Sequence, residues 1–291
     1  MYITFNYLNT CNIDDTEGFG SQYHKIITLY AVACKYNMKY IHIPIQIGHN
    51  YNNDKDWNNK WDIMFNFKKL SYNHEIDIET IDKEFSTDGY PLELVIQQNN
   101  HNKLYFYFHT FDIFNKQPEF FFKDIQDDII AAYDESNYNR TLIYNKNKIN
   151  IAIHIRVYND YDIVCENINS FLESDRKKSE RYYFTCEMYE KLIVELKHKY
   201  PNSDIHIFSQ EKYFDIKFLK LRQIENINIH FDDLNLFDTF HHLCKSDILV
   251  MGLSSLSIVA GFYNKNTVIY LPYCFPPVLK SWIIYNDKLG L

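Results

Sequence analysis

An arginine at the end of an apolar run is the first residue of this chain whose type and position suggest chemistry. Arg156 directly follows residues 151–155, Ile-Ala-Ile-His-Ile, a run that is typical of a buried parallel strand. In open α/β sheets the carboxyl ends of such strands line the ligand-binding crevice. A guanidinium placed there offers a fork of donors that matches phosphate oxygens. The alternative is that Arg156 pairs with a carboxylate of its own domain.

A group of serines later in the chain has a second pattern suited to an anion. Ser254, Ser255, Leu256 and Ser257 stand between the predicted strand 247–251 and an apolar run that we expect to be helical. A strand, a small polar turn and a helix in this order direct backbone N–H groups and hydroxyls towards an anion. A serine cluster at this position can also serve only as the helix N-cap.

A turn near the amino terminus contains two of the seven glycines of the chain. Gly18, Phe19, Gly20 and Gln22 lie between the predicted strand 2–7 and a helical pattern. Glycine before a helix permits positive φ and a close approach of the backbone to a ligand. A tight strand-to-helix turn without any ligand needs the same residue types.

Taken in order, these segments resemble motifs of the α1,2-, α1,6- and protein O-fucosyltransferases. The turn Gly18-Phe-Gly-Ser-Gln22 is similar to their G-x-G-N-Q turn, and His154-Ile-Arg156 is similar to their H-x-R-R-x-D motif. The segment 254–257 resembles their final S-S-F-S, and residues 205–209 resemble the strand that ends in F-S-D. The chain departs from these motifs at Val157 and Gln210, which replace the second arginine and the F-S-D aspartate, and the remaining aspartate falls at Asn159, or at Asp160 with a shift of one residue.

The resemblance implies a GT-B-like α/β fold in which two Rossmann-like domains face a cleft. It implies an inverting, metal-independent glycosyltransferase that moves a sugar, with fucose from GDP-fucose as the best match, to a glycan or protein acceptor. Arg156 would be the catalytic group on the β-phosphate, and Ser254, Ser255, Leu256 and Ser257 would hold the diphosphate. His154 would lie near the base, although it could instead be a hydrogen-bonded core histidine.

The replacement of the second motif arginine by Val157 keeps two other functions open. One is a catalytically weak nucleotide-sugar-binding or structural protein on the same fold, because one cation fewer would stabilise the leaving group less. The other is a transferase that uses a different nucleotide sugar.

Recognition of guanine requires a carboxylate opposite two adjacent N–H donors, because a buried donor left unmatched costs about 1–3 kcal/mol. The resemblance implies an aspartate upstream of the final predicted strand, where Asp232, Asp233 and Asp238 are candidates. We choose Asp233. One of the three could instead cap the helix that begins near Leu234.

No metal is expected at the site. The pairs Asp54/Asp56 and Asp160/Asp162 have the D-x-D spacing of manganese-dependent transferases, but such pairs arise by chance among 38 acidic residues. Adjacent His241 and His242 would point to different faces of a helix. Inversion also needs a base that removes the proton from the hydroxyl of the acceptor. Five loop carboxylates are equal candidates for this base: Asp14, Asp15, Glu17, Asp160 and Asp162.

The predicted elements alternate between strand and helix, most regularly beyond residue 150. We expect strands at 151–156, 204–209, 226–231, 247–251 and 267–271, with helices at 182–200, 213–222, 235–245 and 255–263. The first half is predicted to hold strands at 2–7, 39–45, 92–96 and 104–108, and helices at 22–37 and 119–133. A helix is predicted in the tail, 276–289. Domains of 1–145, on the acceptor side, and 146–291, on the nucleotide-sugar side, follow from the polar stretch 137–150.

Composition excludes several other protein classes. A net charge of −8 argues against nucleic acid as a partner. No stretch approaches the roughly 18 apolar residues of a membrane span, and the first residues do not resemble a signal peptide. We therefore expect a cytoplasmic enzyme without a membrane span. Trp57 and Trp61, four residues apart, are expected to pack one helical face onto the domain, the alternative being a platform for the acceptor sugar.

Overall fold

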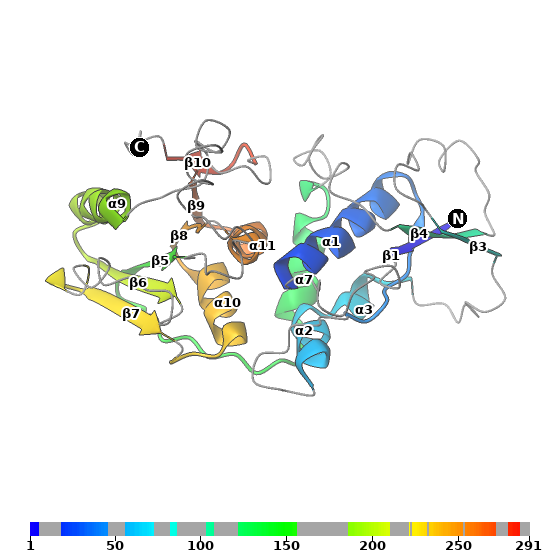
Figure 1. The fold of residues 1–291 in the computed structure, drawn as a ribbon, viewed down its shortest axis with the longest axis horizontal. Helices are drawn as coiled ribbons and strands as arrows, with labels where there is room; N and C mark the ends of the chain where they lie inside the picture. Colours follow the sequence, from blue (N-terminus) through cyan, green and yellow to red (C-terminus); the bar gives the residue numbers. More distant parts are fainter. Residues whose placement is uncertain are drawn as a thin grey trace, which may run out of the picture. The chain divides into compact units, whose positions relative to one another are not determined.

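The computed structural model describes residues 1–5, 19–45, 56–72, 82–85, 103–107, 122–155, 186–209, 221, 223–231, 233–252, 254–271 and 279–285. The chain divides into two compact units, Met1–Asn139 and Arg140–Leu291. Each unit contains a sheet in which all paired strands are parallel, together with helices (Figure 1). The predicted α/β class is therefore confirmed. None of the described helices is long and apolar enough to cross a bilayer.

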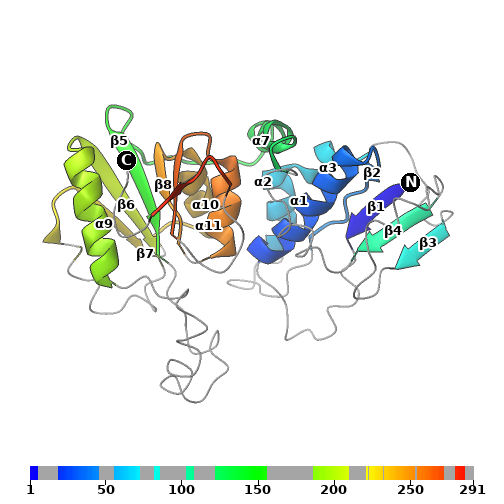
Figure 2. The same cartoon turned by 90° about the horizontal axis from the view of Figure 1, so that it is seen from above.

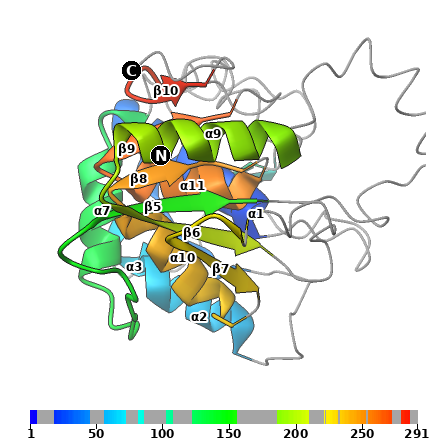
Figure 3. The same ribbon diagram turned by 90° about the vertical axis from the view of Figure 1, so that its left-hand side faces the viewer.

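The sheet of the carboxyl-terminal unit has six strands in the order β10-β9-β8-β5-β6-β7. They are β5 (Ile149–His154), β6 (Ser203–Ser209), β7 (Ile227–Phe231), β8 (Ile248–Val250), β9 (Thr267–Tyr270) and β10 (Ile283–Ile284). Figure 3 shows them one after another across the sheet. Counted within the unit, and read from β7, the order is 3-2-1-4-5-6, which is that of a doubly wound Rossmann sheet.

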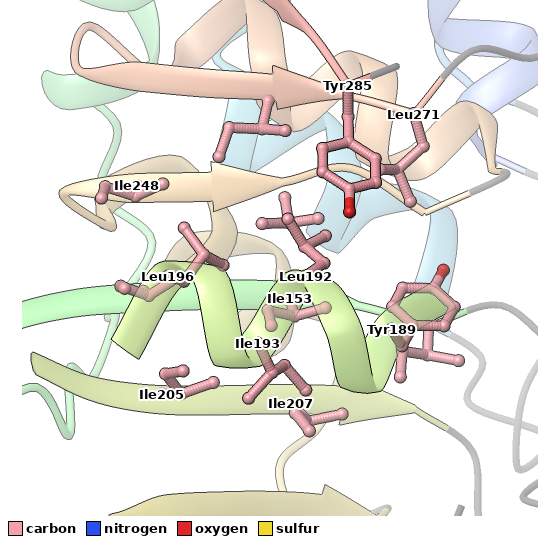
Figure 4. Close-up of a cluster of buried hydrophobic side chains, with 14 of the residues drawn as sticks. Ile153, Tyr189, Leu192, Ile193, Leu196, Ile205, Ile207, Ile248, Leu271 and Tyr285 are labelled. Carbon is pink, nitrogen blue, oxygen red and sulfur yellow. The ribbon is translucent and has the colours of Figure 1, made fainter. Parts of the chain in front are cut away.

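Helices cover both faces of this sheet (Figure 2). One face carries α9 (Cys186–Lys199), and the other carries α10 (Leu236–Lys245) and α11 (Ser255–Tyr263). Burial on both sides explains the apolar centre of β5, Ile151-Ala-Ile153, since only the first residue of this strand is exposed. Ile153, Ile205 and Ile207 point to α9 and pack with Leu192, Leu196 and their neighbours in the main core (Figure 4). The intervening residues of the same strands point to α10 and α11.

The amino-terminal unit holds a four-stranded sheet in the order β2-β1-β4-β3. Its strands are β1 (Tyr2–Phe5), β2 (Lys39–Tyr40), β3 (Asp82–Phe85) and β4 (Lys103–Tyr107), and its helices are α1 (Phe19–Lys35), α2 (Trp57–Phe65), α3 (Phe67–Leu70) and α7 (Gln126–Asp134). These helices lie on one side of the sheet (Figure 2). Aromatic side chains from α1, α2 and α7 form much of the core, with Phe65 only 5.7 Å from Tyr133 between ring centres.

Two expectations about secondary structure are wrong. The helix predicted over 276–289 does not form in its described part, 279–285, where a turn leads into β10. Ile283 and Ile284 pair in parallel with Ile269 and Tyr270, and β-branched residues favour this extended state. The N-cap of α10 is Asn235, whose side chain accepts a hydrogen bond from Asp238 N–H, and not an aspartate. The predicted strand 92–96 and helix 213–222 lie outside the described residues.

Candidate functional site

The carboxyl edge of the second sheet contains a switch point between β5 and β8. From β5 the chain proceeds to β6 on one side, whereas from β8 it proceeds to β9 on the other. Connections that diverge in this way leave a crevice at the strand ends, which is where doubly wound folds bind their ligands. His154 is the last residue of β5, and Gly252 follows β8 directly before α11.

Ser257 joins the ends of these two strands. Its Oγ accepts a hydrogen bond from Gly252 N–H at 3.2 Å and is also hydrogen-bonded to Nδ1 of His154. All three residues are buried. A serine hydroxyl has one donor and two acceptor positions, so the tautomer of His154 sets the direction of its hydrogen bond with Ser257. The structure thus gives His154 a hydrogen-bonded place within the core, and its role near a nucleotide base stays a prediction.

Gly252 allows the two strand ends to approach this closely. A Cβ atom at this position would lie only 3.0 Å from the carbonyl carbon of His154 and 3.3 Å from its Nδ1, and closer still to the carbonyl oxygen. Backbone atoms cannot move aside as a flexible side chain can, so any other residue would push β8 away from β5. Glycine is therefore needed at this point for a packing reason. Gly252 is not among the predicted site residues, although its place between a strand and the serines was a usable signal.

The serines at the start of α11 have different structural roles. Ser254 is the N-cap, with an extended backbone and a side chain that accepts a hydrogen bond from Leu256 N–H at 3.2 Å. Ser257 is fully buried, whereas Ser254, Ser255 and Leu256 are partly exposed. The first turn of a helix leaves N–H groups without intrahelical acceptors, and the helix dipole makes them favourable for an anion. The expected N-cap is confirmed, and it leaves backbone donors of the first turn at the switch point.

A second polar group lies two strands further along the same edge. Asp233 follows β7 and its Oδ2 is 2.9 Å from Nδ1 of His230, while the Asp233 side chain stays 53% exposed. Nε2 of His230 is in turn 3.1 Å from Nδ1 of His206 on β6. Burial lowers the pKa of His206 to about 4, with the neighbouring His230 as a second cause. Neither histidine was selected from the sequence, because only the register Phe208↔His230 brings them together.

The segment that precedes β5 is fixed to α10 at the same face. Nε2 of His242 accepts a hydrogen bond from Ile143 N–H at 3.0 Å, and Tyr144 OH donates to the carbonyl oxygen of His242 at 2.8 Å. Burial lowers the pKa of His242 and raises the pKa of Tyr144 well above its ordinary value. Both nitrogens of His242 are thus used, since Nδ1 is bound to the carbonyl oxygen of Asp238.

The predicted turn of the amino-terminal unit is described only from Phe19 onwards. Phe19 and Gly20 are the first residues of α1, so Gly20 occupies a helical position that requires no positive φ. The ring of Phe19 stacks on that of Trp61, with 3.6 Å between centres and 6° between planes. Gln22 is buried as well. Trp61 is completely buried and Trp57 nearly so, which confirms that they pack within the unit and excludes the sugar platform.

Several predicted residues lie outside the described part of the chain: Gly18, Arg156, Asp232, Asp54, Asp160, Asp162, Asp14, Asp15 and Glu17. Among the described residues, no three histidine, cysteine, aspartate or glutamate side chains form a group that could hold a metal ion. Asp56, the described member of its D-x-D pair, occupies the N-cap position of α2 and is exposed. Cys34 and Cys244 are free thiols.

Comparison with known proteins gives no family assignment. Neither a protein-family model nor a curated protein matches this sequence. The fucosyltransferase resemblance therefore depends on the motifs themselves, on their order, and on the kind of fold in which they lie.

Proposed function

We propose that this chain is a metal-independent glycosyltransferase of the GT-B kind. It would transfer a sugar, with fucose from GDP-fucose as the best match, to a glycan or protein acceptor. The observation that carries the proposal is the position of the α11 start beside the end of β5, at the switch point of a sheet in Rossmann order. Two Rossmann-like domains facing a cleft, one for the acceptor and one for the nucleotide sugar, belong to the same proposal.

The diphosphate of the donor would lie at the first turn of α11. Backbone N–H groups there carry the partial positive charge of the helix end, and no acidic residue lies in this turn to oppose an anion. The partly exposed hydroxyl of Ser255 adds a further donor. Arg156 follows His154 by two residues in the chain, and the resemblance implies that it adds a charge-assisted contact to the β-phosphate.

The base would lie towards β7. Neighbouring strands are about 4.8 Å apart, so roughly 10 Å separates the end of β5 from that of β7. This span suits a nucleoside that extends from a diphosphate at α11 to a carboxylate at Asp233. Oδ2 of Asp233 is bound by His230, and the exposure of the side chain leaves acceptor positions for the N–H donors of guanine.

In the transfer step, the acceptor oxygen forms a bond to the anomeric carbon as the bond from that carbon to the phosphate oxygen breaks. The electron pair of the broken bond leaves with GDP, and the acceptor's proton passes to a base. Fixed donors at α11 and Arg156 would stabilise the charge that develops on the departing phosphate without a metal ion. The cytoplasmic location and the absence of a nucleic-acid partner stay predictions from the sequence.

The first experiment is a thermal-shift comparison of GDP, GDP-fucose, UDP-, dTDP- and CMP-sugars, each with and without EDTA. A ligand that binds only the native state raises the melting temperature. We expect the largest increase with the guanine compounds, and no loss of it in EDTA. Equal stabilisation by UDP-sugars would overturn the choice of GDP, and loss of binding in EDTA with rescue by manganese would favour a D-x-D metal site.

The second experiment tests Arg156 and catalysis together. Arg156→Ala should weaken GDP binding roughly ten- to hundredfold, because charge-assisted hydrogen bonds contribute about 1.5–3 kcal/mol. Arg156→Lys should restore part of it, since an ammonium keeps the charge but loses the fork. Arg140→Ala, the same change outside the site, is the control. GDP binding without sugar transfer to any acceptor would favour the catalytically weak nucleotide-sugar-binding protein that Val157 suggests.

A further inference from the structure

Asp233, His230 and His206 form a continuous hydrogen-bonded row that leads from the middle of β6 to the end of β7. The first contact, Asp233 Oδ2 to His230 Nδ1, is 2.9 Å, and the second, His230 Nε2 to His206 Nδ1, is 3.1 Å. The two ring centres are 5.4 Å apart and the ring planes differ by 7°. The distance between the ring centres equals the N···N distance plus the radii of the two rings, which is the value for rings whose centres and facing nitrogens lie on one line. The imidazoles therefore meet end to end in nearly one plane, with the hydrogen bond on the line between them.

This geometry assigns the protons of the row. A carboxylate is only an acceptor, so Nδ1 of His230 carries a proton. In the neutral form of His230 the lone pair lies on Nε2, and the contact with His206 then needs a proton on Nδ1 of His206. Burial keeps His206 neutral near pH 7, because it lowers its pKa to about 4. With His230 in this form, both histidines are Nδ1–H tautomers, and their two N–H bonds point in series towards Asp233.

Packing prevents the rings from turning. The ring of Phe208 lies nearly parallel to that of His230, with 4.9 Å between centres and 19° between planes. Tyr144 contacts His206 edge-on at 4.9 Å, and its hydroxyl is fixed to the carbonyl oxygen of His242. His206 is 5% exposed and the His230 side chain 11%, against 53% for the Asp233 side chain. A rigid, buried pair thus ends in an exposed carboxylate.

We propose that His230, supported by His206, is a positioning residue that sets the orientation of the Asp233 carboxylate for selection of the nucleobase. This inference rests on the proposed function. The hydrogen bond from His230 uses one of the two lone pairs of Oδ2, so Oδ1 and the other lone pair of Oδ2 remain for a base that presents two adjacent N–H donors, as guanine does at N1 and its exocyclic amine. A carboxylate free to rotate would lose much of this discrimination, because recognition of paired donors depends on a fixed acceptor geometry.

The experiment compares the affinities of GDP and inosine diphosphate, which lacks the exocyclic amine. The wild type should prefer GDP by roughly tenfold or more, as expected for one hydrogen bond to a charged group. His230→Phe should reduce this ratio to near one. His230→Asn, whose amide nitrogen replaces Nδ1, should restore part of it. His198→Phe, the same change at an exposed position of α9, should leave it unchanged.

Nitrogen NMR of the histidine side chains provides a readout on the wild type that needs no variant to fold. Both His206 and His230 should appear as Nδ1–H tautomers, and an Nε2–H tautomer at His230 would overturn the proposal. An unchanged GDP to inosine diphosphate ratio in His230→Phe would overturn it while the proposed function stands. A wild type that binds neither nucleotide would overturn both.

Discussion

Ser257→Ala removes a single oxygen atom that joins β5, β8 and α11. The Oγ of Ser257 is the acceptor for Gly252 N–H at 3.2 Å and the partner of His154 Nδ1. Ser257 is completely buried and His154 is 8% exposed, so neither former partner gains access to solvent through this change. The substitution leaves one buried backbone donor and one buried imidazole nitrogen without this oxygen.

The expected loss of stability follows from these two buried groups. A buried polar group left unsatisfied destabilises a protein by about 1–3 kcal/mol. Two such groups that share one oxygen are coupled, so the sum is an upper bound, and we expect a loss of about 2–4 kcal/mol from the free energy of unfolding of the carboxyl-terminal unit. This is a large part of the roughly 5–15 kcal/mol that holds a domain folded. The variant should fold, with a lower stability.

Native-state hydrogen exchange measured on peptides from β5 and β8 separates this unit from the other one. Ser255→Ala is the matched control, because it makes the same change two residues earlier in the same helix, at a partly exposed position. We expect the control to stay within about 0.5 kcal/mol of the wild type. If Ser257→Ala opens no faster than Ser255→Ala, then the shared oxygen does not hold the strand ends together.

Three further outcomes follow from buried polar groups and helix caps. Burial lowers the pKa of His24 to about 3 and that of His206 to about 4; the unfolded chain therefore binds more protons between those values and pH 6.5. The free energy of unfolding should therefore be highest above pH 6.5. Below pH 6.5 it should fall by about 1.4 kcal/mol per pH unit for each histidine. Urea unfolding measures this slope, and His206→Asn should reduce it. Asn264→Ala removes an amide whose Nδ2 donates to two main-chain carbonyls at 3.1 and 3.0 Å. It should destabilise the carboxyl-terminal unit by about 2–4 kcal/mol, again measured by urea unfolding. Asn235→Ala should cost about 0.5–2 kcal/mol through loss of the cap of α10, whereas Asn235→Asp should keep the cap and most of the stability.

Much of the carboxyl-terminal sheet could be predicted because its strands are buried on both faces. The runs that became β5, β8 and β9 are apolar over most of their length, and β6 places Ile205, Ile207 and Phe208 in the core. β3 could not be found in this way. Its sequence, Asp-Lys-Glu-Phe, has no strand pattern, and the segment is extended because it pairs with β4 in the register Asp82↔Lys103.

The same contrast separates the parts of the candidate site. The serines at the start of α11 and His154 were predictable, because the start of a helix and the end of a strand are local patterns. The contact of Gly252 with the His154 carbonyl depends on β8 pairing with β5 across about 100 intervening residues. The row from His206 to Asp233 depends likewise on the register of β6 with β7. Contacts of this kind are set by tertiary pairing, which a single sequence does not reveal.

On the proposed function, the two ends of the nucleotide would depend on different kinds of groups. The diphosphate would be bound largely by backbone N–H groups of α11, which no side-chain substitution removes as long as Gly252 keeps the strand ends together. The base would be selected by side chains alone, through Asp233 and the histidines behind it. Changes at Asp233 or His230 could therefore alter the choice of nucleotide while the fold and the anion site stay intact. If the proposal holds, the position of a nucleotide in this fold and its identity would be separable properties, because one would depend on main-chain geometry and the other on two hydrogen-bonded side chains.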